Sequence, residues 1–121
     1  MPTPKAIIAA AIASLASTAA LGHPLPKVAS PAPNAILSTS PTEIRIGFSE
    51  KLVAAFSGLE LDNSKGLPVD TGPAAVNPKN KKEMAATIKT MLAPGIYTVK
   101  WHAVAADTHR VKGHYSFQVK P

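Results

Sequence analysis

Hydrophobic and polar side chains alternate in several short segments, which is the period of a β-strand with one buried face. The alternation is clearest over residues 96–104 and 112–119, and it recurs over residues 43–48 and 57–61. Turn-forming residues separate these segments, most densely over residues 62–66. Short strands with turns every ~8–12 residues predict an all-β domain, an antiparallel sandwich or barrel.

The remaining segments carry a weaker pattern. Residues 24–41 contain five prolines, which predicts an edge strand over residues 25–30 followed by an irregular connection. Residues 70–82 carry turn formers and lysines, and we expect them to be the least structured part. Residues 84–90 fit either a helix or a strand. The side chains facing inward in the strand would be Met84, Ala86 and Ile88.

The N-terminal 22 residues have the pattern of a secretory signal peptide. Lys5 supplies the positive charge, residues 6–16 are almost wholly apolar, and Ala20-Leu21-Gly22 fits the small-x-small cleavage pattern. The alternative is an anchoring helix, but the run is short and rich in alanine. Cleavage after Gly22 leaves one domain, residues 23–121, and predicts export to the periplasm.

Composition excludes several classes of protein. The absence of cysteine excludes a disulfide scaffold, a zinc ribbon, a thiolate copper centre and a cysteine nucleophile. The formal charge of +6 falls to +5 when Lys5 is removed. Only 5% of the residues are aromatic, so a stacking platform for nucleic acid is not expected. We interpret the positive charge as a solvated surface.

Candidate metal ligands stand at two places. Asp107 and His109 are two positions apart, so in extended backbone their side chains point to the same side. Cleavage would make His23 the first residue, and its free amine and ring Nδ1 could then chelate one ion. Pro24 has no N–H that could deprotonate and bind, so this chelate stops at two nitrogens.

Three further residues are weaker candidates. Glu50 follows the strand over residues 43–48, where a solvated charge is the simpler interpretation. His102 and His114 lie on strand faces opposite Trp101 and Tyr115, which favours surface imidazoles. His114 could instead orient a ligand or bind a second, weaker ion.

Five motifs taken together resemble the CopC family of periplasmic copper-resistance proteins. They are His-Pro at 23–24, Phe-Ser-Glu-Lys at 48–51, Pro-Gly-Ile-Tyr-Thr-Val-Lys-Trp at 94–101, Ala-Asp-Thr-His at 106–109 and Val-Lys-Gly-His-Tyr-Ser-Phe at 111–117. The resemblance implies a small Greek-key β-barrel of cupredoxin or immunoglobulin-like form. It also implies one Cu(II) per chain, bound by His23, Asp107 and His109 with Glu50 close by, in an axial position or behind a ligand.

The family's first members also bind Cu(I) through a methionine-rich loop, and this chain departs from that pattern. Met84 and Met91 are isolated, so we expect no separate Cu(I) site and interpret both as core side chains. The resulting hypothesis is a monomeric, non-enzymatic protein that sequesters copper or passes it to an inner-membrane importer or another copper carrier. Binding should fail at low pH, where the nitrogen ligands are protonated. The alternatives are a histidine-brace redox enzyme and an immunoglobulin-like interaction module without metal.

Overall fold

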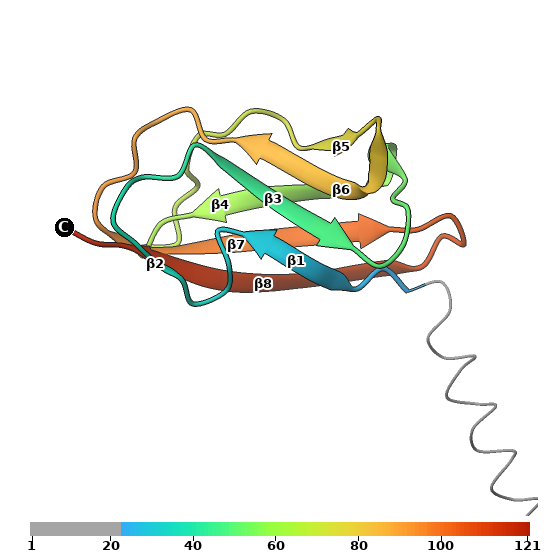
Figure 1. The fold of residues 1–121 in the computed structure, drawn as a ribbon, viewed down its shortest axis with the longest axis horizontal. Coiled ribbons are helices and arrows are strands. Elements are labelled where there is room, and N and C mark those ends of the chain that lie inside the picture. Colours follow the sequence, from blue (N-terminus) through green and yellow to red (C-terminus); the bar gives the residue numbers. More distant parts are fainter. Residues whose placement is uncertain (1–22) are drawn as a thin grey trace, which may run out of the picture.

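The computed structural model describes residues 23–121, so the predicted signal peptide lies outside the described residues. Two four-stranded sheets pack face to face (Figure 1). The first sheet has the order β1-β3-β6-β5, and the second has the order β2-β8-β7-β4. The first comprises β1 (Pro26–Ser30), β3 (Glu43–Phe48), β5 (Ala75–Asn77) and β6 (Asn80–Thr87); the second comprises β2 (Ile36–Leu37), β4 (Gly58–Asp62), β7 (Gly95–Val104) and β8 (Arg110–Val119).

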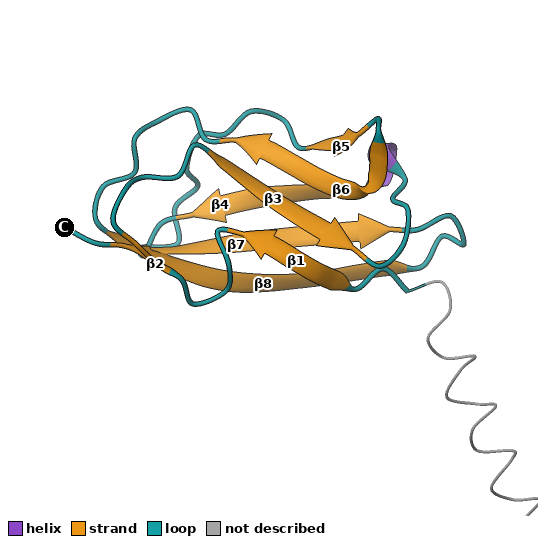
Figure 2. Ribbon diagram, viewed as in Figure 1, coloured by secondary structure: helices purple, strands orange, loops and turns teal. Residues whose placement is uncertain are grey.

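The strand connections confirm the predicted all-β Greek-key fold in its sandwich form. The chain crosses between the sheets after β1, β2, β3, β4 and β6. A single turn of 3₁₀ helix, Ala54–Phe56, interrupts the strands of residues 23–121 (Figure 2). No helix within that range is long and apolar enough to cross a membrane.

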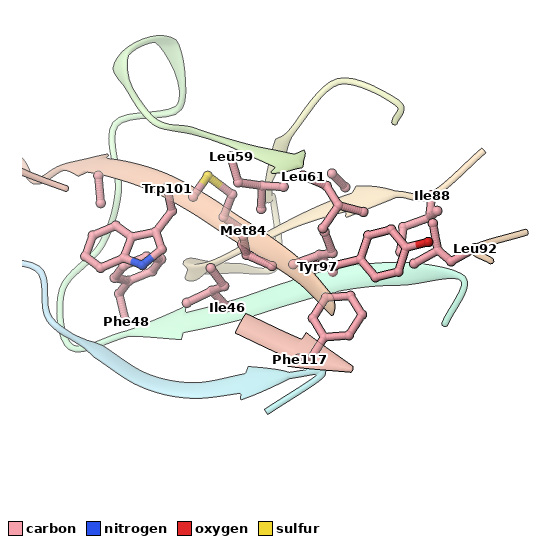
Figure 3. Close-up of a cluster of buried hydrophobic side chains, with 14 of the residues drawn as sticks. Ile46, Phe48, Leu59, Leu61, Met84, Ile88, Leu92, Tyr97, Trp101 and Phe117 are labelled. Atoms are coloured by element: carbon pink, nitrogen blue, oxygen red, sulfur yellow. The ribbon is translucent and has the colours of Figure 1, made fainter. Parts of the chain in front are cut away.

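The core lies between the sheets and follows from the period-two pattern. From β3, Ile44, Ile46 and Phe48 point inward and are almost completely buried. They face a row from the second sheet that includes Trp101 and Phe117 (Figure 3). A fully buried side chain of this kind is worth about 1.5–3 kcal/mol. These two facing rows therefore fix which side of each strand is exposed.

The four segments with the clearest alternation all form strands, within two residues of the predicted limits. Residues 84–90 are resolved in favour of a strand, since β6 covers Asn80–Thr87 with Met84 and Ala86 buried. The prediction for residues 70–82 was partly wrong, because β5 and the start of β6 form an antiparallel pair there. Consecutive residues at the start of β6 are all exposed, so neither face of the strand is buried there and no period-two pattern marks it.

Two other expectations are corrected. The irregular connection after β1 contains β2, which pairs in parallel with the end of β8, so the second sheet is not purely antiparallel. A two-residue strand is too short to show a period. Met91 is 89% exposed and is not a core residue, whereas Met84 is fully buried as expected. Met91 follows the end of β6, in a loop where the alternation no longer fixes its direction.

Trp101 closes one end of the core against Phe48 and Gly113. The Phe48 and Trp101 rings meet edge to face, with centroids 5.2 Å apart. Gly113 is the cross-strand partner of Trp101, and the indole lies over its Cα. A Cβ at Gly113 would lie 2.6 Å from Trp101 Cζ2, which is too close for any side chain. The glycine therefore makes room for the tryptophan.

We expect Gly113→Ala to lower the free energy of unfolding by about 1–3 kcal/mol, because the indole must move in a packed core. Gly72→Ala is the matched control, since its Cβ would meet Thr87 Cβ at an ordinary 3.7 Å. Urea titrations monitored by tryptophan fluorescence measure both variants. Equal stability of the two variants would contradict the close packing of Trp101 on Gly113.

Candidate metal centre

The loop between β7 and β8 brings Asp107 and His109 together. Thr108 has a left-handed backbone with φ of 70°, and its N–H donates to the Ala105 carbonyl at 2.8 Å. The His109 backbone N–H donates to Asp107 Oδ1 at 3.1 Å, which closes a turn through the aspartate side chain. The two side chains converge as predicted. The cause is this turn rather than the extended backbone assumed from the sequence.

The Asp107 carboxylate also contacts the His109 ring. His109 Nδ1 lies 2.8 Å from Asp107 Oδ2, and the two side chains are 60% and 37% exposed. Hydrogen bonds from the His109 backbone and then from its ring lower the pKa of Asp107, and the charges of His109 and His23 act in the same direction. The carboxylate thus holds one ring nitrogen, which leaves Nε2 as the nitrogen available to an ion.

His23, at the start of the described sequence, also lies beside this loop. Its ring stacks on the His109 ring, with centroids 4.7 Å apart and an interplanar angle of 29°. Pro24 is fully buried and anchors the segment before β1. Figure 1 shows this segment and the β7–β8 loop at the same end of the sandwich. Two imidazoles far apart in the sequence are therefore in contact.

Ser49 fastens this N-terminal segment, a role that sequence reasoning missed. The Leu25 N–H donates to Ser49 Oγ at 2.9 Å, and Ser49 Oγ donates to the His23 carbonyl at 3.2 Å. The Ser49 N–H donates in turn to the Leu25 carbonyl at 2.8 Å. No local sequence pattern marks this role, because the contacts join residues 24 and 26 positions apart.

Glu50 lies beside the same group. It is half-buried and lines a groove of about 380 Å³ together with Lys51, Lys82 and Asp107. Glu50 thus shares a groove with Asp107, whose carboxylate contacts the His109 ring.

His102 and His114 lie elsewhere. Both project from the outer face of the second sheet and line a groove of about 550 Å³ there. His102 is half-buried over Gly58, whose Cβ would lie 2.8 Å from the imidazole Cε1. His114 is exposed opposite Lys100. The structure thus separates these two histidines from His23 and His109.

The described residues do not yet form a complete coordination site. No group of three or more His, Cys, Asp or Glu side chains within residues 23–121 is arranged to hold a metal ion. In the uncleaved chain the α-nitrogen of His23 is an amide, which does not act as a neutral amine ligand. The structure brings His23, Asp107 and His109 together as neighbours and places Glu50 on the adjoining groove.

Comparison with known proteins places this architecture in a family. Residues 27–120 match the CopC domain. Over 90 residues, covering 74% of this chain and 73% of the relative, it is 40% identical to protein YobA of Escherichia coli strain K12. Over 113 residues, covering 89% and 88%, it is 40% identical to copper resistance protein C of Xanthomonas campestris pv. juglandis.

A solved structure agrees with these sequence matches. PcoC, a methionine-rich copper-resistance protein from Escherichia coli, superposes with a TM-score of 0.72 at 34% identity, covering 81% of this chain and 99% of PcoC. The fold and the sequence matches define a small β-sandwich of the copper-resistance class. The chain belongs to the CopC family.

We expect the Asp107 carboxyl of the copper-free protein to titrate below its ordinary range. In His109→Ala the backbone N–H remains and the ring is lost, so the pKa of Asp107 should rise without returning fully to its ordinary value. The sign follows from the lowered pKa: the contact with His109 persists at neutral pH and is lost as the pH falls through that pKa. Carboxyl ¹³C NMR measures it, with His102→Ala as control. An unchanged Asp107 pKa in His109→Ala would contradict the ring contact.

Proposed function

We propose that the exported protein begins at His23 and binds one Cu(II) at the end of the sandwich where His23 meets His109. The observation that carries this proposal is the stacking of the His23 and His109 rings, with His109 held by Asp107. The family supports the choice of metal, since relatives are named for copper resistance.

The donor set suits Cu(II). Removal of residues 1–22 would convert the α-nitrogen of His23 into an amine that, with ring Nδ1, offers two nitrogens to one ion. His109 Nε2 would add a third nitrogen. Asp107 would add a carboxylate oxygen if its contact with His109 Nδ1 opens on binding, because an ion on Nε2 lies on the far side of the ring from that contact. Three nitrogens and one oxygen suit a tetragonal Cu(II) site, and Cu(II) heads the divalent affinity order. Glu50 would act from the axial side or through another ligand.

The same residues argue for binding and transfer rather than catalysis. The centre is exposed on the loop side, with the His109 and Asp107 side chains 60% and 37% exposed, so an ion there would be accessible to a partner. We propose that the protein works in the periplasm, holding Cu(II) or passing it to an inner-membrane importer or another carrier. Met84 is sealed in the core and Met91 stands alone on the surface, so we expect no Cu(I) site.

The first test concerns the N-terminus. We expect the exported protein to have the intact mass of residues 23–121. A chain with one glycine added before His23 should lose the amine–imidazole chelate. Loss of a residue that only hydrogen-bonds a ligand lowers metal affinity about 10–100-fold. The Cu(II) affinity of the glycine-extended chain should fall by more than this. Competition titration against a chelator of known affinity measures it. Equal affinity of the two chains would show that the chelate does not anchor the ion.

The second test ranks the side chains. His109→Ala should weaken Cu(II) binding most, because it removes an equatorial nitrogen. Asp107→Ala should follow, since water partly replaces its oxygen, and Glu50→Ala should cost about 10–100-fold.

His102→Ala and His114→Ala are the controls and should change little, since both histidines lie on the outer sheet face. Competition titrations on all five variants give the order. A larger loss in either control than in His109→Ala would overturn the assigned site.

A further inference from the structure

Four exposed lysines gather at the end of the sandwich that carries the candidate metal centre. Lys51 follows β3, and Lys79, Lys81 and Lys82 belong to the turn and first residues of the β5–β6 hairpin. Together they line a hollow of about 290 Å³ with Pro78 and Asn80. We call Lys51, Lys79, Lys81 and Lys82 the lysine patch.

The lysine patch adjoins the metal centre directly. Lys51 and Lys82 also line the groove of about 380 Å³ that contains Glu50 and Asp107. The two hollows thus share two lysines and form one surface. Figure 1 shows the β5–β6 turn and the β7–β8 loop at the same end of the molecule. A partner seated on the lysine patch would therefore face the ion.

The backbone under the lysine patch is fixed by short polar contacts. Asn77 Oδ1 accepts from the Lys79 N–H at 2.9 Å, and Asn80 Oδ1 accepts from the Lys82 N–H at 3.3 Å. The Lys81 carbonyl accepts from the Leu52 N–H at 2.8 Å, which ties the hairpin to the segment after β3. These bonds fix the backbone from which the four exposed lysine side chains extend.

The charges of the lysine patch are not neutralised by the domain. Elsewhere Arg45 bonds Glu43 and Glu83 at 2.6 Å each, and Lys100 bonds the buried Asp62 at 2.7 Å. Within residues 23–121, none of the four patch lysines forms an ion pair of this kind. The carboxylate of the neighbouring Glu83 is already engaged by Arg45 and Asn77. The positive charge of the lysine patch can therefore attract an external anion.

We propose that the lysine patch docks an acidic surface of the protein that exchanges copper with this chain. A protein partner is favoured over an anionic membrane because the lysines line a hollow, which fits a protruding acidic segment better than a flat bilayer. Identifying the partner as the one that exchanges copper rests on the proposed function. The docking itself does not.

Two synthetic copper donors test the proposal. Both begin with the same Gly-His copper-binding head, and one carries a tail of six glutamates while the other carries six glutamines. We expect the exported protein to take Cu(II) from the glutamate donor about tenfold faster at low salt, because opposite charges steer the encounter. The difference should vanish above about 0.2 M NaCl, where the Debye length is below ~8 Å. Stopped-flow absorbance measures the transfer rate.

Two triple variants with equal net charge supply the control. Lys79→Gln/Lys81→Gln/Lys82→Gln should abolish the preference for the glutamate donor without weakening Cu(II) binding, since none of the three is a candidate ligand. Lys65→Gln/Lys89→Gln/Lys120→Gln, which removes three exposed lysines outside the patch, should retain the preference. If both triples lost the preference equally, net charge rather than the patch would be responsible and the proposal would fail.

The remaining outcomes separate the two proposals. Equal rates from both donors with full copper loading would support copper binding and overturn the docking surface. If neither donor loaded the protein, the proposed function would fail. Docking would then be decided by NMR amide shifts of the copper-free protein titrated with hexaglutamate, which should centre on the lysine patch. Stronger binding to phosphatidylglycerol vesicles than to hexaglutamate would assign the patch to a membrane and overturn the proposal.

Discussion

The candidate centre depends on the attachment of the N-terminal segment to the end of β3. Pro24 is buried, and Ser49 bonds both the Leu25 backbone and the His23 carbonyl. These contacts bring His23 to the β7–β8 loop, where its ring stacks on His109. Within residues 23–121, Ser49 Oγ supplies the side-chain hydrogen bonds to the backbone of residues 23–25, and the buried Pro24 and the Ser49 N–H to Leu25 carbonyl bond add to them. The position of His23, rather than the shape of a cavity, is thus what this fold supplies to the candidate site.

The sequence was sufficient to predict each strand that has one buried face. The alternation in β3, β7 and β8 reflects facing rows of core side chains, so it reports tertiary structure as well as local preference. It failed where pairing lacks a buried face. The start of β6 is built from exposed lysines and is held by β5 and by asparagine side chains, and β2 is too short to show a period.

The candidate site was predictable in membership but not in geometry. Residue types and order singled out His23, Asp107 and His109, and the structure brings these three together. The backbone conformation that brings Asp107 and His109 together was not predicted. It is a turn with a left-handed Thr108, closed by the Asp107 side chain, rather than an extended strand. The role of Ser49 depends on a contact between segments distant in sequence, which no local pattern contains. Strand parity placed His102 and His114 on the outer face of the sheet, and the structure confirms that placement.

The proposed function couples metal binding to export through the chemistry of one nitrogen. Before cleavage the α-nitrogen of His23 belongs to an amide, which does not act as a neutral amine ligand. Cleavage would supply the missing donor without moving any strand, because Pro24 and Ser49 already hold His23 beside His109. The precursor would therefore compete poorly for copper inside the cell, and the same fold would become a tight binder only after export. The lysine patch would then dock a partner only when the exported protein already holds copper or is able to bind it.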